Sequence, residues 1–149
     1  MMFKTHLAIG FLIGLIAMHY VQPSNQILFM ILVLLGSLLP DIDHPNSTLG
    51  RKTRIIALFF EHRGFFHGFL SILPILFLLS FLLTKVQLIA VALGYASHLL
   101  SDALTIEGIM PLHPLSRWRL RGFLRTGAFY EGIFLLGVVI IDVIMLWRL

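Results

Sequence analysis

The sequence predicts an all-α fold: an integral membrane bundle of about five transmembrane helices that forms one domain over residues 1–149. The composition predicts this class, because 58% of the residues are hydrophobic, 12% are charged and the mean hydropathy is +0.96. A soluble domain carries about 25% charged residues. Five crossings of about 20 residues each use about 100 residues, so loops fit but a separate soluble domain does not. The chain has no cysteine, which excludes disulfides and thiolate metal ligands.

Uncharged stretches locate the helices in order. No Asp, Glu, Lys or Arg lies between Lys4 and Asp41, and a polar turn from Pro23 to Gln26 divides this stretch in two. The second helix is shorter than the usual ~17–25 residues, so either the bilayer thins there or the hairpin enters without crossing. A second turn at 84–87 separates the third helix from the fourth. The expected helices cover about residues 4–21, 26–40, 63–85, 85–102 and 127–147.

Basic residues predict the orientation. If the N-terminus is cytoplasmic, nine of the eleven Lys and Arg residues lie inside, and only Lys85 and Arg148 lie outside. Loops rich in Lys and Arg stay in the cytoplasm, so we expect the N-terminus inside and the C-terminus outside. The basic cluster at 117–121 is expected to contact anionic lipid headgroups, and no nucleic-acid partner is expected.

Imidazole and carboxylate groups gather at one level of this predicted bundle. Ionisable groups in membrane segments are costly and mark functional sites by default. With the N-terminus inside, eight of these residues lie at the cytoplasmic helix ends, whereas His19 lies at the opposite face. The eight candidate metal ligands are His6, Asp41, Asp43, His44, His62, His67, His98 and Asp102.

The spacing of some of these residues suits a shared metal ion. His98 and Asp102 are four residues apart on a predicted helix, so both side chains lie on one face. Asp41 and Asp43 lie between two prolines and alternate along an extended stretch. Without a metal, the same spacings also fit a hydrogen-bonded pair on the helix for His98 and Asp102, and an ordinary solvated turn for Asp41 and Asp43.

The residues also suggest a chemistry. A catalytic zinc site uses three protein ligands and a water, so these ligands suffice for two or three divalent metal ions, with zinc favoured. Paired metals activate water and bind both oxygens of a displaced phosphoester. Glu61 or Glu131 is a candidate general base, and Arg63 with Arg125 could orient a phosphate.

Several motifs follow one another along the chain. They are Thr5-His6, GSLLPDIDHP at 36–45, HRGFFH at 62–67, GYASHLLSD at 94–102 followed by Thr105 and Gly108, and Arg125-Thr126-Gly127 followed by Glu131. Together and in this order they resemble the YdjM family of inner-membrane, metal-dependent hydrolases. The resemblance implies a multi-pass protein of the inner membrane whose metal ligands map onto the eight residues above. It also implies a distant similarity to zinc-dependent phospholipases C and P1-type nucleases.

We therefore expect a membrane-bound metal-dependent hydrolase, in which a metal-activated water cleaves a phosphoester of a lipid or lipid-linked substrate at the cytoplasmic interface. Two alternatives come from other classes of protein. Intramembrane histidines and carboxylates also mark metal-ion or proton transporters, although a transport path needs polar groups near the bilayer midplane. A structural membrane protein could also use a metal only to fasten its loops. The sequence does not indicate an oligomeric state.

Overall fold

The structure is a computed structural model, which describes residues 1–43 and 67–148; for Ile42 and Asp43 it describes the backbone alone. Four of the predicted site residues therefore lie outside the described residues: His44, Glu61, His62 and Arg63. The side chain of Asp43 lies outside them as well.

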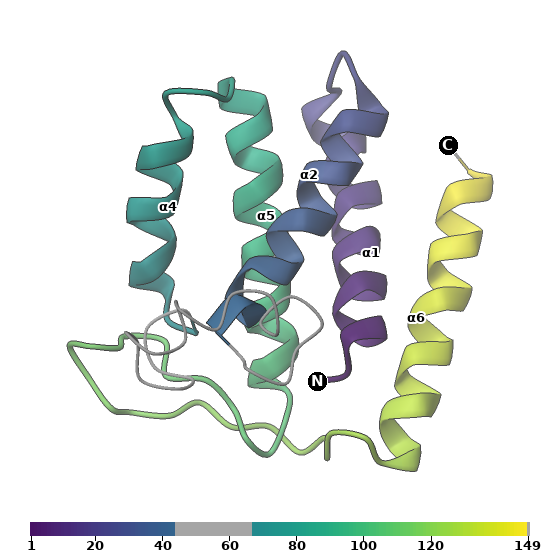
Figure 1. The fold of residues 1–149 in the computed structure, drawn as a ribbon. Helices are drawn as coiled ribbons and strands as arrows, with labels where there is room; N and C mark the ends of the chain where they lie inside the picture. Colours follow the sequence, from purple (N-terminus) through teal and green to yellow (C-terminus); the bar gives the residue numbers. More distant parts are fainter. Residues whose placement is uncertain (44–66, 149) are drawn as a thin grey trace.

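The described residues form helices and connecting loops, which confirms the predicted all-α class. Two isolated β-bridges join loop residues, Thr105 with Leu124 and Ile109 with Leu120, but no strand forms among the described residues. The helices follow the predicted order (Figure 1). They are α1 (Phe3–Val21), α2 (Gln26–Leu38), the 3-10 turns η1 (Leu39–Asp43) and η2 (Phe69–Ser71), α4 (Ile72–Leu79), α5 (Lys85–Ala103) and α6 (Phe129–Trp147).

Three of these helices, α1, α5 and α6, are long and apolar enough to cross a membrane. The segments that contain α2 and α4 are apolar but shorter. The third helix was predicted over 63–85, whereas the regular helix begins only at Ile72 and ends at Leu79. The number of crossings and the orientation stay predictions.

Side-chain caps begin two helices at the predicted turns. The side chain of Asn25 accepts a hydrogen bond from Leu28 N at 2.9 Å at the start of α2. At the start of α5, Thr84 and Gln87 form a reciprocal capping box, with distances of 2.9 and 3.4 Å. Such caps satisfy the backbone N–H groups that a first helical turn leaves without partners. Each polar turn thus ends one apolar segment and starts the next.

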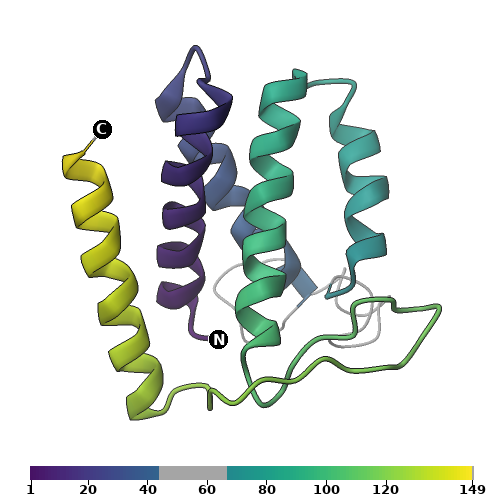
Figure 2. The same cartoon turned by 180° about the vertical axis from the view of Figure 1, so that it is seen from behind.

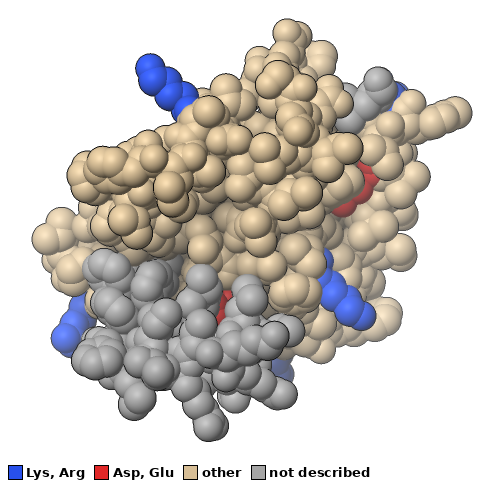
Figure 3. All heavy atoms as spheres, turned by 45° about the horizontal axis from the view of Figure 1, so that its top comes forward, with Lys and Arg blue, Asp and Glu red and all other residues tan. Residues whose placement is uncertain are grey.

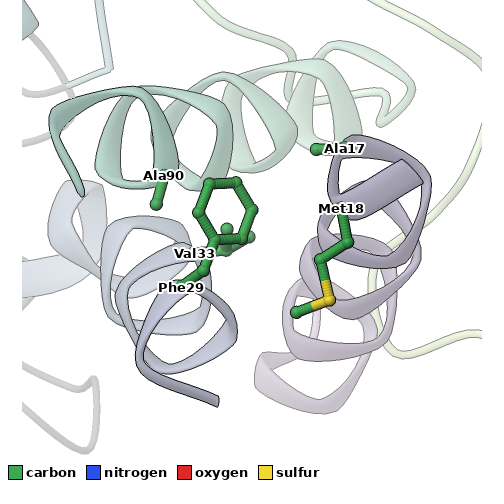
Figure 4. Close-up of a cluster of buried hydrophobic side chains, with 5 residues drawn as sticks. All are labelled: Ala17, Met18, Phe29, Val33 and Ala90. Atoms are coloured by element: carbon green, nitrogen blue, oxygen red, sulfur yellow. The ribbon is translucent and has the colours of Figure 1, made fainter. Parts of the chain in front are cut away.

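Helices α1, α2 and α5 pack into the core of the bundle, with α4 beside α5 and α6 beside α1 (Figures 1 and 2). Between the three central helices, Phe29 and Val33 of α2 contact Met18 and Ala17 of α1 and Ala90 of α5 (Figure 4). Phe29 and Val33 are almost fully buried. This apolar cluster lies toward the end of the bundle where α1 turns into α2.

Two glycines allow α2 and α5 to touch through their backbones. A Cβ atom at Gly94 of α5 would overlap the carbonyl oxygen of Val33, and one at Gly36 of α2 would overlap that of Val91. Only glycine permits this approach, as at the small-residue contacts of membrane helices. The close contact fixes the C-terminal halves of both helices against each other, where the candidate site residues follow.

The outer surface of the bundle is largely apolar. Large hydrophobic side chains are exposed along α4 and α6, among them Phe77 at 68% and Leu136 at 61%, and Phe81 just after α4 is exposed at 72%. Figure 3 shows a face dominated by uncharged residues, with charged residues at only a few positions. A soluble monomer rarely exposes so large a continuous apolar area, so this surface suits contact with lipid.

The described chain segments that carry predicted ligands reach the same end of the bundle. The N-terminus, the C-terminal ends of α2 and α5, and the starts of α4 and α6 lie together at the lower end in Figure 1, while the turns between α1 and α2 and between α4 and α5 lie at the upper end. The loop from α5 to α6 runs beneath the lower end.

A candidate metal centre

At the lower end of the bundle, five predicted ligands from distant parts of the sequence come together. Two groups have ligand atoms that all lie within 4.8 Å of one another, and His98 belongs to both. The groups are His6, His98 and Asp102, and Asp41, His67 and His98. Their side chains come from α1, η1, the segment before η2, and α5.

The ring of His98 is oriented by a backbone contact across the α2–α5 interface. Its Nδ1 lies 2.7 Å from the carbonyl oxygen of Ser37. A carbonyl oxygen can only accept, so Nδ1 carries the proton and a neutral ring presents the lone pair of Nε2. In metal-binding histidines, the ring nitrogen that does not bind the metal commonly donates to a carbonyl oxygen in this way.

The lone pair of His98 Nε2 points at carboxylates. Nε2 is buried without a hydrogen-bond partner within the described part of the chain, and it lies 3.4 Å from Asp102 Oδ2 and 3.8 Å from Asp41 Oδ1. A direct charge-assisted hydrogen bond would measure about 2.7–2.9 Å. Ligand atoms around a tetrahedral zinc ion, at about 2.0–2.1 Å from the metal, lie about 3.3 Å apart. The observed spacing therefore suits a shared cation better than a direct bond.

His6 is oriented in the same way by a serine. Ser101 Oγ donates to the carbonyl oxygen of His98 at 2.7 Å, so it accepts from His6 Nδ1, also at 2.7 Å. The Nε2 atom of His6 then carries the lone pair, and it lies 3.4 Å from Asp102 Oδ1. The two imidazoles are stacked, with centroids 3.8 Å apart and planes 5° apart.

Asp102 faces both groups of ligands. Its Oδ1 lies toward His6 and the Met1 amino group, at 3.4 and 2.5 Å. Its Oδ2 lies 3.4 Å from His98 Nε2 and 3.6 Å from His67 Nε2. An imidazole Nε2 has one lone pair, whereas a carboxylate offers two oxygens, so Asp102 could hold a cation together with the histidines of either group.

Glu131 is buried near this end of the bundle but makes contacts of another kind. Its carboxylate accepts hydrogen bonds from Met2 N at 2.7 Å, Thr5 Oγ1 at 3.1 Å and Gly127 N at 2.6 Å. Oε1 accepts two of these hydrogen bonds and Oε2 accepts one. Glu131 thus connects the start of α6 to the start of α1, and its role as a general base stays a prediction.

Three other residues do not belong to either group of ligands. Arg125 is exposed in the loop before α6 and has no ion pair with an acidic residue among those described. His19 lies at the far end of α1, as expected. His113 is half-buried in the loop after α5, and its backbone lies close to Gly68, the residue after His67.

Sequence reasoning missed the residues that orient the ligands. Ser37 lies four residues before Asp41, and Ser101 lies three residues after His98. Both serines are fully buried, and a small polar residue one helical turn from a candidate ligand is a signal that could have indicated them.

A cavity opens beside the cluster. It has a volume of about 10 Å³, which is room for about one water molecule. His67 and Asp102 form part of its lining, and the loop that follows α5 supplies the rest, including Thr105, Glu107 and Arg119. The cluster therefore has room for about one water molecule on the side of this loop.

Comparison with known proteins decides the family. The family model described as YdjM inner membrane protein matches residues 1–148. The chain belongs to the YdjM family of inner membrane proteins. The match, together with the apolar helices, makes it a multi-pass protein of the inner membrane.

Two relatives illustrate the spread of the YdjM family. The chain is 34% identical over 143 residues to YvsG of Bacillus subtilis (strain 168), which covers 92% of this chain and 89% of the relative. It is 42% identical over 98 residues to the inner membrane protein YdjM of Escherichia coli (strain K12), covering 59% of this chain and half of the relative. No solved structure matches the chain.

Proposed function

We propose that this YdjM-family protein is a metal-dependent hydrolase whose metal centre is formed by His6, Asp41, His67, His98 and Asp102. One observation carries the proposal: the buried Nε2 of His98 has no hydrogen-bond partner among the described residues and faces two carboxylates, while Ser37 orients the other nitrogen. A buried lone pair that faces two carboxylates favours a cation among them, in addition to the Met1 amino group that already meets Asp102 Oδ1. The donor set of imidazoles and carboxylates suits zinc and other N/O-binding divalent ions.

A divalent cation held by these residues would supply a coordinated water whose pKa is lowered to about 7 and would polarise a phosphoryl oxygen. The protein's own contribution is to set the ligands. Ser37 and Ser101 hold two imidazoles in the tautomer that leaves Nε2 free, and helix α5 itself places Asp102 one turn after His98. We propose a phosphoester of a lipid or lipid-linked molecule as the substrate, because the cluster lies at one end of an apolar bundle.

The geometry favours hydrolysis over the two alternatives. A transport path needs ionisable groups along the bundle, but the described cluster is confined to one end of it. A metal that only fastens loops needs no access for a ligand, whereas a cavity adjoins His67 and Asp102.

Metal analysis of purified protein tests the proposal first. We expect wild-type protein in detergent to contain zinc or another divalent metal, and His98→Ala and His67→Ala to lose at least one ion. His19→Ala, at the opposite end of the bundle, is the matched control and should keep the full metal content. Circular dichroism should show that all three variants are folded. Metal-free wild type, or His98→Ala and His67→Ala with unchanged metal content, would contradict the ligand assignment.

Activity is tested with the same proteins. Metal-loaded wild type should release phosphate or a phosphorylated headgroup from vesicles of phosphatidylglycerol, phosphatidic acid and phosphatidylethanolamine, and a chelator should stop the release. A metal-loaded protein that carries the metal across a vesicle membrane and releases nothing would instead support the transporter alternative.

A further inference from the structure

The cavity beside the metal centre has a cationic wall that the metal ligands do not explain. Arg119, from the loop after α5, lines the same cavity of about 10 Å³ as His67 and Asp102. The sequence pattern of alternating arginines at 117–121 indicates only a headgroup anchor. In the structure, Arg119 lines the cavity together with two metal-ligand candidates, whereas Arg117 and Arg121 do not line it.

The segment that carries Arg119 is held in place by backbone hydrogen bonds. Ile109 and Leu120 exchange two of them, at 3.0 and 2.9 Å. Gly108 has a φ of +65°, and a Cβ there would overlap the carbonyl oxygen of Leu120. This glycine lets the two sides of the loop approach closely. Arg119 is therefore adjacent to Leu120, whose backbone is held by two hydrogen bonds.

The same loop is hydrogen-bonded to Asp102 and to a residue near His67, and these two candidate ligands both line the cavity. Thr105 Oγ1 donates to the carbonyl oxygen of Asp102 at 2.7 Å and accepts from Gly108 N at 3.1 Å. On the other side, Phe69 N, two residues after His67, donates to the carbonyl oxygen of Pro111 at 2.9 Å. The loop thus keeps a defined position relative to both ligands that line the cavity.

The guanidinium of Arg119 keeps its charge available. Its Nη1 donates to the backbone carbonyl of Glu107 at 3.4 Å, a long bond that uses one of five N–H donors. Within residues 1–43 and 67–148, no carboxylate forms an ion pair with it. A planar, permanently charged fork is the group best suited to bind two oxygens of a phosphoryl group.

We propose that Arg119 binds the phosphoryl oxygens of the substrate beside the metal centre, and that it is the arginine that positions the substrate. This inference rests on the proposed hydrolase function. The ligand chemistry is a tetrahedral phosphate, which could come from a lipid headgroup or from free phosphate. Arg125, which the sequence suggests for this role, is exposed like Arg119 but does not line the cavity.

Binding of inorganic phosphate to metal-loaded protein in detergent is the direct test. Arg119→Gln should weaken phosphate binding by about 10-fold or more, since it removes a charge-assisted hydrogen-bonding group. Arg119→Lys should recover part of the loss. Arg117→Gln, an arginine of the same loop that does not line the cavity, is the matched control and should change phosphate binding by less than about twofold.

Metal content and vesicle binding separate the possible outcomes. All variants should keep the wild-type metal content, so metal-free wild type would end the hydrolase proposal before Arg119 is tested. Vesicles of phosphatidic acid and of phosphatidylglycerol, compared with inorganic phosphate, show which source the site prefers. If Arg119→Gln and Arg117→Gln weaken vesicle binding equally and leave phosphate binding unchanged, Arg119 is a lipid anchor and the inference fails.

Discussion

Replacing Gly94 by alanine tests whether the close α2–α5 contact builds the metal centre. The added Cβ would lie 2.8 Å from Ser37 N and 2.9 Å from Val33 C, and closer still to the carbonyl oxygen of Val33. Ordinary contacts need about 3.5–4.0 Å, and the carbonyl oxygen of Val33 would lie 1.9 Å from the added Cβ, so the two helices must separate by roughly 1.5–2 Å. The hydrogen bond from His98 Nδ1 to the carbonyl oxygen of Ser37 measures 2.7 Å and would lengthen to more than about 4 Å, beyond the range of a hydrogen bond.

The expected cost follows from these two losses. Overpacking costs about 1–3 kcal/mol, and a buried donor left without a partner costs about 1–3 kcal/mol. We expect Gly94→Ala to lower the free energy of unfolding by about 2–6 kcal/mol and to lose metal. Thermal unfolding followed by circular dichroism, with metal analysis, measures both effects.

Gly137→Ala is the matched control for this experiment. Gly137 also lies in an apolar helix, but a Cβ there has no atom within 4 Å, so alanine should be neutral or stabilising by up to about 1 kcal/mol. If Gly94→Ala unfolds at the same temperature as Gly137→Ala and keeps its metal, the backbone contact does not position His98, and the reasoning is refuted.

Two further predictions concern the buried polar contacts. Ser101→Ala removes the acceptor of His6 Nδ1, so metal affinity should fall by about 10- to 100-fold while the helix content stays unchanged; unchanged affinity in a metal titration would show that Ser101 does not fix the tautomer. Glu131→Gln exchanges an acceptor oxygen for an amide nitrogen, which cannot accept, so one of the N–H groups of Met2 and Gly127 loses its acceptor. It should lower the unfolding temperature by an amount equivalent to about 1–3 kcal/mol while leaving the metal content intact, whereas loss of metal without loss of stability would place Glu131 in the metal centre instead.

Much of the fold follows from the sequence because the apolar segments are long and the turns between them are strongly polar. The predicted breaks at 23–26 and 84–87 coincide with the capped starts of α2 and α5. The third helix was the least accurate, because an uncharged stretch sets only the outer limits of a helix. The structure ends α4 at Leu79, although no charged residue follows until Lys85.

Part of the candidate site could also be predicted. Residue type and position along the helices were enough to indicate that His6, Asp41, His67, His98 and Asp102 reach one end of the bundle. The local i,i+4 spacing was enough to pair His98 with Asp102. Glu131 shows the limit of this reasoning, because a buried carboxylate near the cluster can serve equally as a catalytic base or as an acceptor for backbone N–H groups.

The sequence by itself determined that this protein is an apolar helical bundle, since hydropathy and helical periodicity are local properties of the chain, and it predicted that the candidate metal ligands reach one end of that bundle. Only the tertiary structure decided which nitrogen of each histidine is free, which arginine lines the cavity and what Glu131 binds. The contacts that orient His98 and His6 and that hold Glu131 join residues separated by 61, 95 and 126 positions in the sequence. Such contacts exist only after the helices have packed, because the partner of a side chain is set by the distance between backbones and not by its neighbours in the sequence.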